Sequence, residues 1–150
     1  MNYESHLQDL RETYFRLHPH QRASIARQRL ENPGHGPNLL VTYVSAVEGL
    51  LRSLVIWEGE KPESPSTELY ESYRRATVKQ LYSKYLEQRG RGCLVGEETY
   101  QLVSYAVKYR NHVIHECTYL GQDKFPQLID ACDRFLKAIC ANENIKFDDS

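Results

Sequence analysis

Apolar residues recur at intervals of three and four along nearly the whole chain, and this spacing limits the fold more than any other feature of the sequence. It is the period of an α-helix with one buried face, whereas a half-buried strand needs strict alternation. The first such stretch, which Pro19 stops, carries Leu7, Leu10, Tyr14 and Leu17. No alternating run of strand type occurs in the sequence. The spacing therefore predicts an all-α fold.

Clusters of proline and glycine divide this pattern into separate helices, because such residues interrupt helices and favour turns. The breaks lie at residues 32–37, 58–65, 88–92 and 121–124. Helix starts are marked by Asn38, the Ser64-Pro65 pair, Glu97 and Pro126. We expect an N-terminal amphipathic helix, a short helix over 19–30, and then an up-and-down bundle of four main helices.

Three of these helices supply most of the expected core. The helix after Asn38 presents one apolar face made of Leu40, Val44, Val47, Leu51 and Leu54. The tyrosine-rich helix that follows is expected to run without a break to about Leu86. The last helix has a second apolar face made of Leu128, Cys132, Phe135 and Ile139. These faces predict one shared hydrophobic core.

The length of 150 residues suits a single domain that can bury a core without disulfides or metals. We divide residues 1–150 into an N-terminal helical extension (1–36), a core bundle (38–141) and an acidic, frayed tail (142–150). The formal net charge is −1, which gives no global basic field. A nucleic acid would therefore have to bind to a local basic patch.

The sequence also predicts a cytoplasmic protein that does not associate with a membrane. The first residues lack the charged and apolar regions of a signal peptide. The longest apolar stretch, 39–57, is interrupted by Thr42, Ser45, Glu48, Arg52 and Ser53. The four cysteines are scattered without a CxxC pair, which is typical of reduced thiols.

The segment 109–116 carries the residues with the most chemical potential. Arg110 brings a permanent charge and a fork that fits phosphate, and His115 can exchange protons near neutral pH. At 100° per residue the two lie about 140° apart around the helix. We expect an apolar stripe that faces the core and has Arg110 at its edge, made of Tyr100, Val103, Val107 and Ile114. Without further information, an ion-paired arginine and a satisfied core histidine are the more common interpretation.

The pattern Arg110-Asn111-x-x-x-His115 resembles the R-N-x-x-x-H signature of HEPN domains, over about residues 38–141. HEPN domains are helical bundles that commonly dimerise and often act as RNases or toxins. The resemblance implies an HEPN-like fold and a metal-independent endoribonuclease of the toxin or defence type, without a cofactor. In it, Arg110 contacts the scissile phosphate, His115 acts as general acid or base, and Asn111 orients the site. The RNA 2′-hydroxyl is the nucleophile, and two subunits share one cleft.

Four further residues are candidates for substrate binding or support, namely Glu48, Lys108, His112 and Tyr119. Glu48 is expected to pair with Arg110 or to fix His115, with a solvated or purely structural role as the alternative. A metal site at His112, His115 and Cys117 is disfavoured because the sequence offers no second ligand pair. A backbone-binding patch could form from Arg74, Arg75, Lys79, Arg89, Arg91 and Lys108, although a solvated helix face is the more common origin of such charges.

Two rival functions remain open beside the nuclease. One is a non-catalytic HEPN-like module that binds RNA, a nucleotide or a protein, and the other is a purely structural dimerisation domain. A cognate antitoxin is a candidate partner. In the toxin half of HEPN–MNT pairs, a tyrosine stands two residues after the histidine. Here that position is Cys117, with Tyr119 the nearest tyrosine, which argues against modification by a nucleotidyltransferase antitoxin.

Overall fold

In the computed structural model of this protein, helices make up the regular structure of the residues described. Those residues are 2–15, 18–21, 24, 31, 37–59, 67–118 and 121–146. The elements are α1 (Tyr3–Phe15), α3 (Pro37–Gly59), α4 (Thr67–Tyr73), α5 (Val78–Arg89), α6 (Glu97–Glu116), the 3₁₀ turn η1 (Gln122–Lys124) and α7 (Phe125–Asn142). No strand occurs in this part of the chain, so the all-α prediction is confirmed. Most of the helix expected over 19–30 and the Ser64-Pro65 helix start lie outside the described residues.

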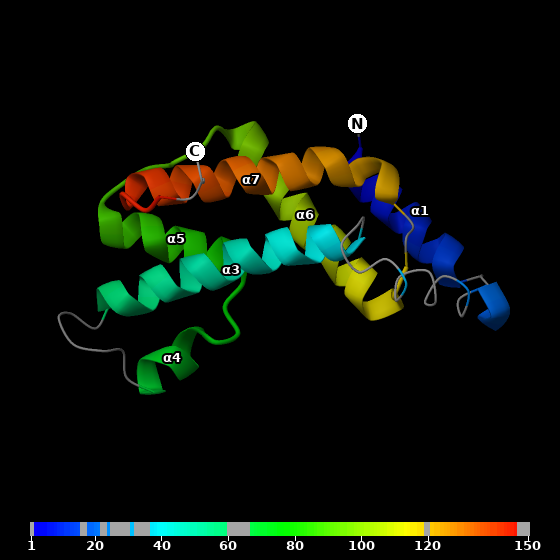
Figure 1. Cartoon of the computed structure of the whole chain (residues 1–150), viewed down its shortest axis with the longest axis horizontal. Helices are drawn as coiled ribbons and strands as arrows, with labels where there is room; N and C mark the ends of the chain where they lie inside the picture. Colours follow the sequence, from blue (N-terminus) through cyan, green and yellow to red (C-terminus); the bar gives the residue numbers. More distant parts are fainter. Residues whose placement is uncertain are drawn as a thin grey trace.

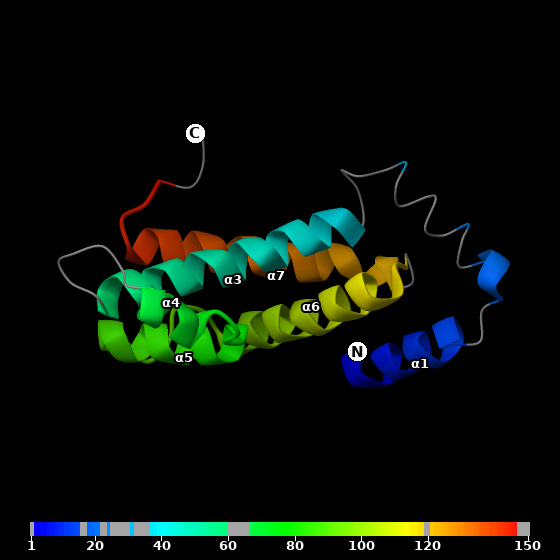
Figure 2. The same cartoon turned by 90° about the horizontal axis from the view of Figure 1, so that it is seen from below.

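Four helices pack in two layers, with α3 and α7 in one and α5 and α6 in the other (Figures 1 and 2). Of the predicted face of α3, Leu40, Val44, Val47 and Leu51 are at most 1% exposed, whereas Leu54 is only partly buried and Val55, 0% exposed, completes the face. The predicted face of α7 is 0% exposed at Leu128, Cys132, Phe135 and Ile139. Burial of these apolar faces, at about 25 cal/mol per Å² removed from water, is the main force that holds the layers together.

The polar residues of the central helix α3 were expected to exclude a membrane-spanning segment. By length and composition alone, however, Pro37–Glu58 is long and apolar enough to cross a membrane, despite Glu48 and Arg52. In the fold, α3 contacts α5, α6 and α7, which is where the central helix of a bundle packs. The core helix of a soluble protein passes the same test, so this finding is weak evidence in either direction.

The directions of the helices depart from the simple alternation that an up-and-down bundle requires. The colours of Figure 1 show that α3, α5 and α7 run the same way along the long axis, whereas α6 runs against them. The reason is that α4 precedes α5, and the turn after α4 returns the chain toward the middle of α3 before α5 begins (Figure 1). The expected number of packed helices is therefore present, but the strict alternation is wrong.

The tyrosine-rich segment forms two helices, α4 and α5, where one was predicted. The new start is a capping box: the Thr77 hydroxyl accepts from the Gln80 backbone N–H at 3.2 Å, and the Gln80 side chain accepts from the Thr77 N–H at 2.9 Å. Arg52 of α3 satisfies the end of the preceding turn by donating to the carbonyls of Tyr73 and Ala76, at 3.0 and 3.4 Å. The periodicity concealed this break because apolar residues continue at helical intervals across it.

Two predicted boundaries of α3 are also corrected. The helix begins at Pro37, so Asn38 lies in its first turn and is not the residue before it. Proline suits that first position because its missing N–H would have no partner within the helix. At the other end, Glu58 and Gly59 belong to α3, whereas they were expected to begin the linker.

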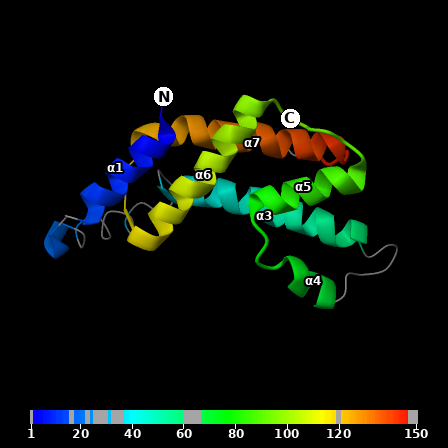
Figure 3. The same ribbon diagram turned by 180° about the vertical axis from the view of Figure 1, so that it is seen from behind.

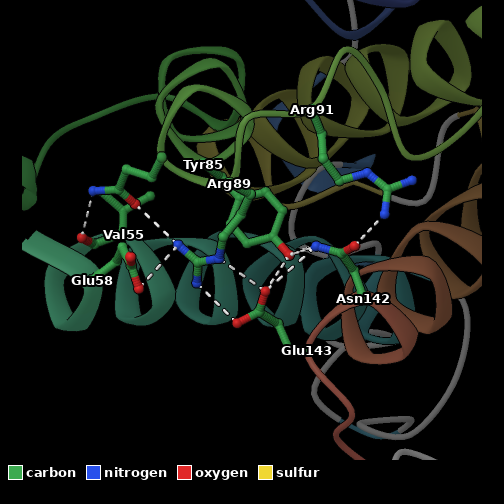
Figure 4. Close-up of polar contacts among 8 residues, drawn as sticks. Val55, Glu58, Tyr85, Arg89, Arg91, Asn142 and Glu143 are labelled. Atoms are coloured by element: carbon green, nitrogen blue, oxygen red, sulfur yellow. Dashed lines mark hydrogen bonds and ion pairs between the residues drawn. The ribbon is translucent and has the colours of Figure 1, made fainter.

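The start of the expected frayed tail is held in place at Asn142 and Glu143, whereas residues 147–150 lie outside the described part of the chain. Figure 4 shows the polar cluster at this end of the bundle. The Glu143 carboxylate accepts from the Tyr85 hydroxyl at 2.7 Å and from two Arg89 nitrogens at 3.0 and 2.9 Å. The Asn142 side chain donates to the Tyr85 hydroxyl and accepts from Arg91. These partners lie far away in sequence, so a search for local patterns could not find them.

The buried face of α6 is rotated from the predicted stripe. Its buried residues are Thr99, Val103, Ala106, Tyr109, His112 and Val113, whereas Ile114 is 50% exposed. The helix packs mainly against α7 and α3, and α1 adds a contact beside it at the end of the molecule where α7 begins (Figure 3). Tyr3 of α1 stacks on Tyr105, and His6 of α1 shares a hydrogen bond with the Tyr109 hydroxyl. This docking covers the Tyr109 side of α6 and leaves the Ile114 side uncovered.

Candidate functional site

The three motif residues occupy different positions around α6. The Arg110 side chain is 11% exposed and points to the edge of the core. His115 is exposed on the far side of the helix, and Asn111 is exposed between them. This is the separation that the helical period predicts for residues five positions apart. The predicted placement of the two side chains on different sides of α6 therefore agrees with the structure, whereas the interpretation of His115 as a core histidine does not, because its side chain is exposed.

Arg110 is held in a fixed orientation by two neighbours. Its Nη2 donates to Glu48 Oε1 at 2.5 Å, and its Nε donates to Asn111 Oδ1 at 3.0 Å. The Glu48 side chain, from α3, is 21% exposed. A charge-assisted bond between two such shielded groups fixes geometry more firmly than a surface pair would. The contact predicted between Glu48 and Arg110 is thus present, whereas its role in any reaction stays a prediction.

Arg110 opens onto a small cavity in which arginines outnumber acids, here called the arginine cavity. Its volume is about 240 Å³, and α3, α6 and the turn between α4 and α5 enclose it. Its charged lining residues are Arg52, Arg74, Arg75, Arg110 and Glu48. Four arginines thus line the cavity with one glutamate, so the lining carries a surplus of positive charge. A phosphate-sized anion is the kind of ligand that such a lining favours.

His115 opens onto a second small cavity, here called the histidine cavity, on the side of α6 that faces α1. Its volume is about 260 Å³. The lining is made of Arg11, Lys108, Asn111, His112, His115 and Glu116. Lys108 is engaged there, because its ammonium group hydrogen-bonds the Glu4 carboxylate and lies 5.1 Å from the centre of the Tyr105 ring. Positive and negative groups are therefore more nearly balanced here than in the arginine cavity.

Asn111 is the one motif residue that borders both cavities. Within one chain, Arg110 and His115 line separate cavities on either side of it. A phosphodiester held by Arg110 would therefore not reach His115 of the same chain without a bend in α6 or a second subunit.

The remaining supporting residues have different surroundings. His112 is only 7% exposed, and burial lowers its pKa, so the neutral imidazole is favoured in the folded state. This arrangement suits a core residue better than a group that binds phosphate. Tyr119 lies outside the described residues. Within the described part of the chain, no group of three His, Cys, Asp or Glu side chains could hold a metal ion.

Sequence reasoning missed Arg52, which it treated only as an interruption of an apolar stretch. Arg52 lies four residues after Glu48 on α3, so the two share one helix face. Its guanidinium bonds to neutral backbone carbonyls, as described above, and among the described residues no carboxylate forms an ion pair with it. The i, i+4 spacing from Glu48 was the signal that could have placed it beside Arg110.

A larger groove lies next to the arginine cavity, between α4 and α5. It has a volume of about 830 Å³ and is lined by Glu71–Ala76 together with Gln80, Ser83, Lys84 and Glu87. The sequence analysis grouped Arg74 and Arg75 with Lys79, but Lys79 lines neither the groove nor the arginine cavity. Only part of the expected basic patch therefore faces a concave surface.

Comparisons of the chain with protein-family models, with curated proteins and with solved structures found no match. The HEPN resemblance therefore rests on the motif itself and on the residues around it.

Proposed function

We propose that this protein is a metal-independent endoribonuclease of the toxin or defence type, with an HEPN-like fold, that acts as a homodimer. The observation that carries the proposal is the surplus of arginine at the cavity of Arg110, with an exposed His115 on the same helix. Arginine supplies a fixed charge for a phosphodiester, and histidine supplies a proton donor or acceptor near neutral pH. The motif that joins them is the one that resembles the HEPN signature.

A second subunit would solve the geometric problem of the separated side chains. The α6 face between Arg110 and His115 includes Asn111 and Ile114, both exposed, and an exposed isoleucine beside polar groups suits a contact surface. If two α6 helices packed across a two-fold axis, Arg110 of one subunit and His115 of the other could border one cleft. The separation of about 140° around the helix then serves the reaction, because each chain contributes to both sides.

The proposed reaction needs no group beyond the RNA and these side chains. The 2′-oxygen attacks the adjacent phosphorus, and the bond from phosphorus to the 5′-oxygen breaks. The proton of the 2′-hydroxyl passes to a general base, and a general acid protonates the leaving 5′-oxygen. His115 is assigned to one of these roles, and Arg110 stabilises the charge that builds on the phosphoryl oxygens. The products are a 2′,3′-cyclic phosphate and a 5′-hydroxyl.

The experiment is RNA cleavage by wild type, Arg110→Ala and His115→Ala, each with and without EDTA. We expect cleavage in both conditions by wild type, and a loss of about 100-fold or more in each variant. Circular dichroism and sedimentation are expected to show an unchanged fold and a dimer in His115→Ala, because that side chain is exposed. A monomer at micromolar concentration would contradict the shared cleft, and cleavage abolished by EDTA would contradict the metal-independent reaction.

One observation favours a second candidate, a non-catalytic module that binds RNA or a nucleotide. Arg110 already has a carboxylate partner in Glu48, and an arginine held this way can serve binding or structure alone. This candidate predicts that wild type binds RNA and leaves it intact with and without EDTA. Binding without cleavage would therefore replace the nuclease proposal with the module.

A further inference from the structure

The arginine cavity and the groove between α4 and α5 are lined in part by the same residues. Arg74, Arg75 and Ala76 border both. These residues form the turn between α4 and α5, which Arg52 and the Thr77 capping box hold in place. The two concave surfaces therefore adjoin along a turn that is fixed from both sides, and a ligand longer than one phosphate could occupy both.

The charges along this turn are available to an anion. Arg75 is exposed, and within the described residues no hydrogen bond or ion pair engages it. Among the residues that the structure describes, Arg74 has one ion pair, an exposed one with Glu71 in which Nε and Oε2 are 3.6 Å apart, and such pairs are worth little in water. With Arg110 and Arg52, these residues place positive charge on three sides of the arginine cavity.

The groove beyond the turn differs in size and chemistry from the arginine cavity. Its volume of about 830 Å³ falls within the range of about 300–1,000 Å³ that is usual for small-molecule sites, whereas the arginine cavity is smaller. Tyr73 offers a ring on which a base could stack, and Gln80 and Ser83 offer hydrogen bonds. Its lysine is offset by an acid, since Lys84 lies 3.4 Å from Glu87. A phosphate therefore suits the first surface, and a base with its sugar suits the second.

We infer that the two surfaces together bind one single strand of RNA. A backbone phosphate lies at Arg52, Arg75 and Arg110, and the neighbouring nucleotides extend over the turn into the groove between α4 and α5. This inference rests on the proposed function, because Arg110 stands where the scissile phosphate would bind. It adds the direction in which the RNA strand extends from Arg110, which the Arg110-Asn111-x-x-x-His115 motif does not determine.

The test is the binding of a fluorescein-labelled RNA of ten nucleotides, followed by anisotropy in the full chain carrying His115→Ala, so that cleavage does not interfere. Adding Arg75→Ala is expected to weaken binding about tenfold and to reduce the slope of log K against log salt by about 1. The matched control is Lys79→Ala, which removes an exposed charge of the same sign from α5, outside both surfaces. It is expected to weaken binding less than about twofold.

A Tyr73→Ala variant separates this inference from simple charge attraction, because it removes a stacking ring and no charge. It is expected to weaken binding of the ten-nucleotide strand about fivefold or more, with the slope of log K against log salt unchanged. Equal losses in Arg75→Ala and Lys79→Ala would overturn the inference, even if wild type cleaves RNA. If RNA binds with the expected dependence on Arg75 but is never cleaved, the inference holds and the nuclease proposal fails. An acidic peptide that binds more tightly than RNA would also overturn it.

Discussion

Arg89 and Arg110 are both mostly buried arginines paired with glutamate, yet their surroundings differ in the balance of charge. Arg89 donates two hydrogen bonds to Glu143, lies 3.8 Å from Glu58, and stacks over the Tyr85 ring (Figure 4). Arg110 has one carboxylate, Glu48, and shares its cavity with three further arginines. Two acids therefore surround one arginine at the first place, and four arginines surround one acid at the second.

This difference separates a structural ion pair from a candidate binding site. At the Arg89 cluster the hydrogen bonds from Arg89 and Tyr85 lower the pKa of Glu143, and the Glu143 hydrogen bond raises the pKa of Arg89. The charged forms of Glu143 and Arg89 thus stabilise each other, and little unbalanced charge remains there to attract a ligand. At the arginine cavity the surplus charge has no acid within the lining to neutralise it. A bound anion could neutralise the positive charge that the lining residues leave unbalanced.

The largest expected effect is on cleavage, where the two arginines should differ most. Arg110→Ala is expected to lower the cleavage rate about 100- to 1,000-fold, because a positioned donor to the transition state is lost. Arg89→Ala should leave the rate per folded molecule within about twofold, since its cluster lies apart from both cavities of α6. The rate is measured on a labelled RNA after the folded fraction is determined by circular dichroism. Comparable losses of cleavage rate in both variants would show that Arg110 does not differ from Arg89 in its role in the reaction.

The next largest effect is on the free energy of unfolding, and here Arg89→Ala is expected to cost more than Arg110→Ala. Arg89→Ala is expected to lower the free energy of unfolding by about 3 kcal/mol, because Glu143 and Glu58 lose their shared partner in a shielded place. Arg110→Ala should cost about 1 kcal/mol, since only one glutamate loses a partner and that group borders a cavity that water can fill. Urea denaturation of both variants measures this. A larger cost for Arg110→Ala would show that it, too, is mainly structural.

Glu143→Gln sharpens the description of the Arg89 cluster through its dependence on pH. We expect a loss of about 2 kcal/mol at pH 7, because hydrogen bonds to a charged group are replaced by neutral ones. The pKa of Glu143 is lower in the folded than in the unfolded state, so its contribution is present above its ordinary value of 4.5. It fades as the pH falls through the folded value. Wild type and variant should therefore converge in acid, and a constant difference at all pH values would contradict this account.

The smallest expected effect concerns the one acid of the arginine cavity. Glu48→Gln should tighten binding of the ten-nucleotide RNA about threefold, because a nearby negative charge is worth at most about 1 kcal/mol when partly screened. Glu48→Asp, which keeps the charge, is the matched control and should not tighten it. If Glu48→Gln weakens binding instead, Glu48 acts chiefly by holding Arg110 in position.

Local pattern was sufficient for some parts of this molecule and insufficient for others. The buried faces of α3 and α7 follow from residue spacing, because one helix face carries the whole apolar signal. The break between α4 and α5 was visible in Thr77-x-x-Gln80, but uninterrupted apolar spacing across it outweighed that signal. The rotated face of α6 was not visible, since it depends on how α7, α3 and α1 pack around that helix, including the contact of α1 with Tyr109.

The sequence by itself determined that the described chain is helical, which faces of α3 and α7 are buried, and that Arg110 and His115 point to different sides of one helix. All of these depend on the fixed period of an α-helix. Only the tertiary structure decided that Arg52, Arg74 and Arg75 gather around Arg110, and that Glu143 pairs with Arg89. Those contacts join residues far apart in the chain, and packing, which no local pattern encodes, brings them together.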